Sequence, residues 1–167
     1  MWRLPLDKFN LGPAFGVVDD WHPNGHRGTD YNGFKGGYPA KAVNDGVITL
    51  NKFSKVLGNI VVLKTGKHYW GYCHLAEPSP LKVGTTVKSG DVIGKCGTTG
   101  SASSGVHLHF TLSLLPEGVI GGKVFDGHAF LKKAIAAQTA PKPVSAVAST
   151  VTPTASAKHC ATCTCKG

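Results

Sequence analysis

Two histidines one residue apart, His107 and His109, stand inside an otherwise apolar run at residues 106–115. Successive side chains of a β-strand point to opposite faces, so both imidazoles would project from one face and Leu108 and Phe110 from the other. Imidazoles are suited to binding a metal ion or to moving a proton near neutral pH. A structural role, in which neighbouring polar groups satisfy both rings, is the alternative, so further ligands have to be sought.

The best source of further ligands is the segment 24–33, NGHRGTDYNG, which holds His26 and Asp30. Its three glycines disfavour a helix and predict a loop that leads into a short strand. His26, Asp30 and one histidine of the HLH motif would supply three nitrogen and oxygen ligands. Three protein ligands and an open position for water are typical of a catalytic zinc, which lowers the pKa of the bound water to about 7.

The other histidine of the HLH motif and His74, at the end of the β-patterned run 68–75, would then be free for catalysis. A neutral imidazole can take the proton of the activated water. Another can hydrogen-bond the oxyanion that forms when hydroxide attacks a carbonyl. The spacing alone leaves a metal site and a chance arrangement of histidines equally open.

Residues outside these motifs are given structural interpretations. His22, His68 and His128 are expected to be surface or capping residues, although His22 directly precedes the ligand segment and could border a groove. Trp21 and Tyr31 are candidates for lining that groove, with core packing favoured for each.

The elements that must position these groups are short strands separated by Gly, Pro, Asn and Asp, followed by one amphipathic helix. Tight hairpins are expected at NDG (44–46) and TGK (65–67), and a Ser-Gly turn at 89–90. The pattern predicts an all-β fold, a compact antiparallel sheet closed into a barrel or sandwich, with a short C-terminal helix. The expected strands are 40–43, 46–53, 59–65, 68–75, 85–97 and 106–115, and the expected helix is 128–138.

The 167 residues divide by composition into a folded domain at 1–138, an Ala/Pro/Thr-rich linker at 139–158 and a Cys-rich tail at 159–167. The linker has too few apolar residues to bury, so it and the tail are expected to be disordered. Four soft ligands lie within the tail, but a thiol-rich end without a bound metal is the simpler interpretation. In the domain, Cys73 and Cys96 are expected to be small buried apolar residues.

The net charge of +9 comes from 18 Lys and Arg against 9 Asp and Glu, scattered singly along the chain. Such a field favours a polyanionic partner. The charge alone does not identify that partner: no nucleic-acid-binding motif supports nucleic acid, and an anionic cell wall would be attracted equally well. No apolar run is long enough to span a bilayer, and the N-terminus lacks the pattern of a secretory signal. We expect a monomer without membrane insertion.

Several motifs occur together and in order: GHRGTDYNG, PAKAVNDGVIT, GNIVVLKTG, GYCHL and VKSGDVIGKCGTTGSASSGVHLHF. Over residues 15–115 the chain resembles the M23 family of zinc metallopeptidases, the lysostaphin and LytM-like peptidoglycan endopeptidases. The resemblance implies that His26, Asp30 and His109 bind zinc. It further implies that His107 is the general base and that His74 stabilises the transition state. The expected fold is a LytM-like antiparallel β domain whose loops wall a narrow groove, and the small-residue loop 97–105 is either one such wall or a flexible connection.

The resemblance implies a zinc endopeptidase that cleaves peptide crosslinks or stem peptides of bacterial peptidoglycan. The missing signal and the linker suit a phage endolysin, made in the host cytoplasm and acting on the wall after release, with another extracellular route as the alternative. The rival function is a catalytically inactive LytM-like module that binds or regulates the wall. A lipoyl-like carrier, suggested by VKSGDVIG, would need a lysine where Ser89 and Gly90 stand.

Overall fold

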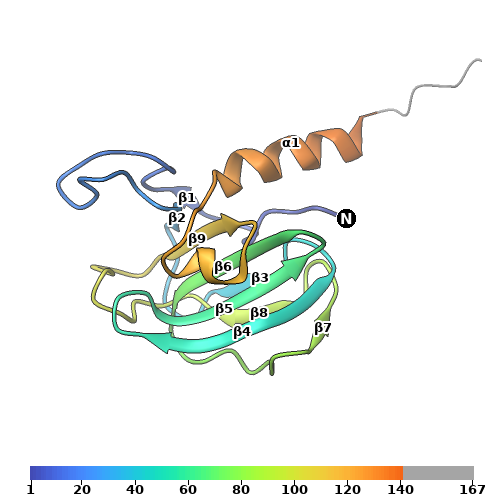
Figure 1. Cartoon of the computed structure of the whole chain (residues 1–167), viewed down its shortest axis with the longest axis horizontal. Coiled ribbons are helices and arrows are strands. Elements are labelled where there is room, and N and C mark those ends of the chain that lie inside the picture. Colours follow the sequence, from blue (N-terminus) through green and yellow to red (C-terminus); the bar gives the residue numbers. More distant parts are fainter. Residues whose placement is uncertain (141–167) are drawn as a thin grey trace, which may run out of the picture.

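The computed structural model describes residues 1–140 as an antiparallel β domain with one short C-terminal α-helix (Figure 1). Seven strands form the main sheet in the order β1-β2-β9-β6-β5-β4-β7, and β3 and β8 pair in a second, two-stranded sheet. The predicted tail, and the linker beyond residue 140, lie outside the described residues. The strands are β1 Asn10–Leu11, β2 Thr29–Asn32, β3 Pro39–Lys41, β4 Gly46–Ser54, β5 Gly58–Thr65, β6 His68–Leu75, β7 Thr86–Val87, β8 Val92–Lys95 and β9 Leu108–Ser113.

The main core lies on one face of the large sheet. On β9 the alternating residues Leu108, Phe110 and Leu112 enter this core, together with Trp70 and Tyr72 of β6. Alternation therefore turns the intervening residues of both strands toward the opposite face.

The opposite face carries a smaller apolar cluster of Ile60, Val62, Cys73 and Val119. Val119 comes from the 3₁₀ helix Pro116–Val119, which follows β9 and covers part of this face. Both faces of β5 are thus buried, which explains its continuous apolar sequence.

The helix α1, Gly127–Thr139, confirms the predicted helix at 128–138. Asp126 caps its N-terminus by accepting a hydrogen bond from the backbone N–H of Ala129, and Leu131 is fully buried. Near its other end, Gln138 accepts a hydrogen bond from the Trp2 backbone N–H and donates one to the Trp2 carbonyl. The N-terminal segment and the helix are therefore tied together beside the sheet (Figure 1).

The antiparallel all-β fold is confirmed. Of the two predicted hairpin turns, one is confirmed and the other is wrong. TGK does close a hairpin, between β5 and β6. NDG instead joins β3 to β4, which lie in different sheets, so the hairpin predicted there is wrong. The run 85–97 splits at the predicted Ser-Gly turn, where Gly90 has a φ of 96°, and its halves pair with β4 and β3. The NDG segment and the Ser-Gly turn each connect strands of different sheets. The strands on either side of these turns pair with strands distant in sequence and not with each other.

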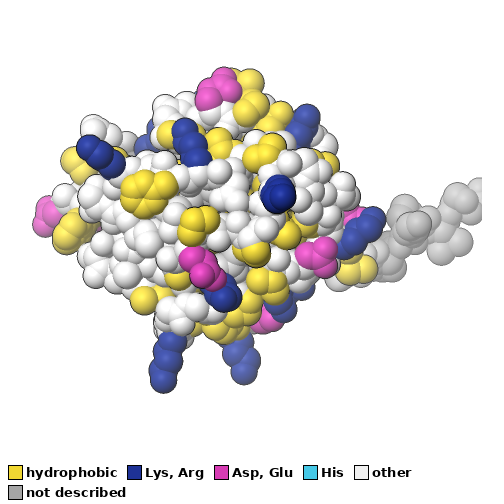
Figure 2. Space-filling model, turned by 90° about the horizontal axis from the view of Figure 1, so that it is seen from below, with side chains coloured by type: hydrophobic (Ala, Val, Ile, Leu, Met, Phe, Trp, Pro, Cys, Tyr) yellow, Lys and Arg dark blue, Asp and Glu magenta, His cyan; other side chains and the backbone are white. Residues whose placement is uncertain are grey.

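The basic residues remain dispersed in the folded domain. On the face seen in Figure 2, Lys and Arg side chains stand apart from one another and no histidine is visible. Within residues 1–140, no helix is both long enough and apolar enough to cross a membrane.

Candidate metal centre

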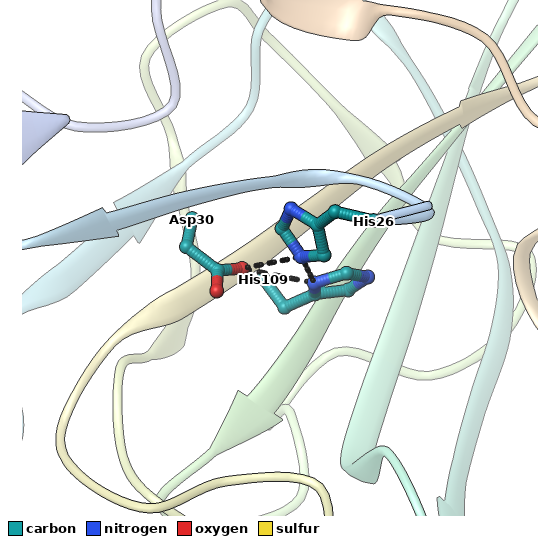
Figure 3. A group of neighbouring side chains, drawn as sticks. All are labelled: His26, Asp30 and His109. Carbon is teal, nitrogen blue, oxygen red and sulfur yellow. Dashed lines mark hydrogen bonds and ion pairs between the residues drawn. The ribbon is translucent and has the colours of Figure 1, made fainter. Parts of the chain in front are cut away.

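The structure brings His26, Asp30 and His109 together around one point (Figure 3). His26 Nε2 lies 3.0 Å from His109 Nδ1 and 3.3 Å from Asp30 Oδ1. Asp30 Oδ1 in turn lies 2.9 Å from His109 Nδ1. His26 comes from the loop before β2, Asp30 from β2 and His109 from β9, so three donor atoms from two distant segments converge.

The surroundings of His26 and Asp30 set the orientation of the imidazole ring and the ionisation of the carboxylate. His26 Nδ1 lies 3.2 Å from the Ala14 carbonyl, to which it donates a hydrogen, so in the neutral ring the unprotonated nitrogen is Nε2, which faces the other donors. Such a carbonyl contact is usual for metal-binding histidines. Burial alone would raise the pKa of Asp30, but the neighbouring imidazoles of His109 and His26 hold it below its ordinary value. The carboxylate is therefore ionised, as a metal ligand must be.

The donor set fits a zinc ion. Two imidazole nitrogens and one carboxylate oxygen are the ligand types of catalytic zinc sites. Tetrahedral bonds of ~2.0–2.2 Å place ligand atoms about 3.4 Å apart. The three observed separations, 2.9, 3.0 and 3.3 Å, differ from this value by a few tenths of an ångström.

His107 and His74 lie beside these donors. His107 donates Nδ1–H to the Gly105 carbonyl at 2.8 Å, and its Nε2 is 3.8 Å from Asp30 Oδ2. The His74 ring centre lies 4.7 Å from that of His107. His74 Nδ1 lies 2.7 Å from the Thr99 carbonyl, and burial lowers its pKa to about 4. Both rings, when neutral, therefore present Nε2 as a hydrogen-bond acceptor.

The position of His74 depends on a break in strand β6. Tyr72 and Leu75 both enter the main core, so the two residues between them leave it on the opposite face. His74 is the one non-glycine residue within the described range with a positive φ, 58°, and the β5–β6 register shifts beside it. A bulge of this kind re-aims a side chain next to a functional site. Regular alternation would instead have pointed His74 into the core.

A groove passes over Asp30 and the four histidines described above. A hollow of about 510 Å³ and a smaller one of about 250 Å³ share Trp21, His22, Asp30, Ala102 and His107. The loop 97–105 contributes Ala102, Ser104 and Gly105, so it forms a wall of the groove as one interpretation predicted. These two hollows are the two arms of the groove. The larger arm is also lined by His26, Arg27, Ser54, Val56, Leu57, His74, His109, Val119 and Ile120.

Some residues outside the motifs lie elsewhere than predicted. Trp21 is 79% exposed at the groove, so the core position favoured for it is wrong, whereas Tyr31 is fully buried in the core. His128 is half-buried and pairs with the Tyr31 hydroxyl at 2.8 Å. His68 is half-buried among aromatic rings. Neither is therefore a simple surface residue.

His22, expected to be a surface or capping residue that could border a groove, lies at the groove. Its ring packs against that of His26, with 4.2 Å between centres, and it is only 26% exposed. It also pairs with Asp19. The Asp-x-x-His spacing is the only sequence signal for this pair, and by itself it is too common to be informative.

An antiparallel β domain with a His₂Asp donor set at the base of a groove defines a metallohydrolase-like site. Residues 24–119 match peptidase family M23, and the chain belongs to this family of zinc metallopeptidases. The resemblance found in the sequence is thereby confirmed.

Three relatives illustrate the match. Peptidoglycan DD-endopeptidase ShyC of Vibrio cholerae is 38% identical over 118 residues, which cover 65% of this chain and 25% of the relative. Glycyl-glycine endopeptidase ALE-1 of Staphylococcus capitis is 36% identical over 112 residues, which cover 63% of this chain and 29% of the relative. The catalytic domain of lysostaphin from Staphylococcus simulans superimposes with a TM-score of 0.63 at 30% identity, covering 74% of this chain and 92% of that one. The chain spans about a quarter of the length of the curated relatives it matches.

Proposed function

We propose that this protein is a zinc-dependent endopeptidase that hydrolyses peptide crosslinks or stem peptides of bacterial peptidoglycan. The observation that carries the proposal is the convergence of His26, Asp30 and His109 at the base of the groove, with two further imidazoles beside them. Membership in family M23, whose relatives include named peptidoglycan endopeptidases, supports the substrate class.

His26, Asp30 and His109 would hold the zinc ion. When bound, zinc supplies Lewis-acid polarisation and lowers the pKa of a water molecule. The Gly105 carbonyl fixes His107 so that Nε2 faces the site, where it accepts the proton that the water loses. His74 assists from beside His107. Its neutral ring presents Nε2 as an acceptor, so His74 would stabilise an oxyanion only after Nε2 has taken up a proton from solvent.

The groove accounts for selection of an extended peptide. Its two arms meet beside Asp30 and His107, so a chain lying through both would pass the reacting groups. Small residues of the 97–105 loop form part of one wall and leave room for a substrate with small side chains.

The peptidase domain is proposed to comprise residues 1–138. Family similarity covers 24–119, but the Trp2–Gln138 hydrogen bonds tie both flanking segments to the same body. The phage-endolysin setting, the monomeric state and the action outside the cell remain predictions from the sequence.

The test combines zinc analysis with wall hydrolysis. One zinc per chain, measured by elemental mass spectrometry, and soluble fragments released from purified walls are the expected results. Mass spectrometry of those fragments from walls of several bacteria identifies the bond, among Gly–Gly, D-Ala–Gly and D-Ala–diaminopimelate linkages. A protein that binds walls but neither retains zinc nor releases fragments would instead be the inactive LytM-like module.

A further inference from the structure

A carboxylate–imidazole pair, Asp19 and His22, stands at the groove beside the metal centre without a part in the mechanism above. It lies in the loop between β1 and β2, which extends away from the sheets (Figure 1). Asp19 Oδ1 accepts hydrogen bonds from the backbone N–H groups of Trp21, at 3.0 Å, and His22, at 2.7 Å. The same oxygen lies 2.8 Å from His22 Nδ1. A single carboxylate oxygen therefore fixes both the turn and the imidazole ring.

This contact sets the tautomer of His22. The Asp19 carboxylate only accepts hydrogen bonds, so His22 Nδ1 carries the hydrogen and the neutral ring has an acceptor at Nε2. Among residues 1–140, no group hydrogen-bonds to that Nε2. His22 lines both arms of the groove, so its ring borders the path proposed for the substrate.

The place of His22 differs from that of the other two free imidazoles. His74 and His107 pack against each other, with His107 near Asp30 and His74 near His109. His22 instead packs on His26, with the rings inclined by 49°. A peptide lying in both arms would therefore meet the His74–His107 pair on one side of the metal ligands and His22 beside His26.

We propose that His22 is a substrate-binding residue whose Nε2 accepts a hydrogen bond from a backbone N–H of the peptide in the groove. Asp19 is the positioning residue that holds the ring in this orientation. The inference rests on the proposed function, because it deepens the recognition of a peptide substrate by the same groove. The competing explanation is purely structural: His22 would only pack on His26 and keep it in place.

Kinetics on soluble crosslinked peptidoglycan fragments separate these explanations. For the zinc-loaded His22→Ala protein we expect KM to rise about threefold to tenfold, the effect of losing one hydrogen bond, while kcat stays within about twofold. His22→Gln restores an acceptor and should recover part of the KM. Asp19→Ala should resemble His22→Ala, and Asp20→Ala, an exposed neighbour in the same loop, is the matched control with unchanged KM.

Zinc content and direct binding decide the remaining outcomes. Loss of zinc from His22→Ala, or an unchanged KM, would overturn the inference in favour of the structural role. If the wild type hydrolyses none of the fragments, the proposed function fails, and calorimetric binding of the same fragments still tests His22. Weaker binding to His22→Ala than to the wild type would support the inference, whereas equal binding, or no binding to either protein, would overturn it.

Discussion

Asp30 and His109 are direct register partners in the antiparallel pair formed by β2 and β9. Directly opposite residues place their side chains on the same face with Cβ atoms about 4.5–5.5 Å apart, which accounts for the 2.9 Å contact between Asp30 Oδ1 and His109 Nδ1. Two of the three proposed metal ligands are therefore held by regular sheet structure, and only His26 depends on a loop.

Substitution of the two histidines of the HLH motif should separate metal binding from proton transfer. We expect His109→Ala to lose both zinc and wall lysis. His107→Ala should keep about one zinc per chain and lose activity by at least about 10²-fold, the usual effect of removing a general base. Elemental analysis and turbidity of purified walls measure the two properties. Wild-type lysis by His107→Ala would show that the base is assigned to the wrong residue.

A side chain at residue 28 is predicted to displace the His109 ring, because only glycine leaves room for it. A Cβ at residue 28 would lie 2.7 Å from His109 Cε1 and 2.8 Å from the Phe110 carbonyl oxygen. Gly28→Ala should therefore destabilise the domain by about 1–3 kcal/mol and weaken zinc binding, as measured by urea unfolding and metal competition. Gly36→Ala is the matched control, since its Cβ would meet only Val106 at 3.8 Å. Equal zinc affinity in both variants would contradict the prediction.

The bulge at His74 should be visible in stability. A left-handed conformation is strained for residues with a Cβ, and glycine relieves that strain. We expect His74→Gly to be more stable than His74→Ala by about 1 kcal/mol in urea unfolding, while both variants lose activity. An alanine variant as stable as the glycine variant would mean that the φ of 58° is not maintained in solution.

Removal of metal should lower thermal stability reversibly. Zinc bound only to the folded state stabilises it by about 4 kcal/mol when its free concentration is a thousand times Kd. We expect a strong chelator to lower Tm and added zinc, but not magnesium, to restore it. A His26→Ala protein should respond to neither treatment, because it lacks one of the three donors. A chelator-insensitive wild-type Tm would contradict a zinc site at this place.

Cys73 and Cys96 should resist alkylation while the protein is folded. Both thiols are buried, and burial raises the pKa of each to about 12, so little reactive thiolate exists at pH 8. Peptide mapping after iodoacetamide treatment should find both positions unmodified in buffer and modified in urea. Rapid labelling of either residue in the native protein would disagree with its burial.

The β9 part of the site could be predicted because it depends on local alternation. A period of two in VHLHFTLSLL places His107 and His109 on the same side whatever the strand pairs with, and Leu108 and Phe110 enter the core as expected. The helix at 127–139 was equally predictable from its apolar spacing. These features need only a few neighbouring residues.

Other features could not be predicted from neighbouring residues. The NDG segment has the composition of a hairpin turn, yet β3 pairs with β8, which lies far along the chain. Trp21 is as apolar as a core residue but is exposed at the groove, because the loop that carries it stands away from the sheets. Likewise, His74 reaches the site through a bulge that reverses the direction given by alternation.

The sequence by itself determined the residue types of the site, the strand periodicity and the family, since these are properties of short segments and of their order. Only the tertiary structure decided that His26, Asp30 and His109 meet, that His74 turns toward them and that His22 borders the groove. The reason is that strand pairing and loop packing join segments far apart in the chain, such as His26 and His109, which are 83 residues apart, and no local pattern specifies such contacts.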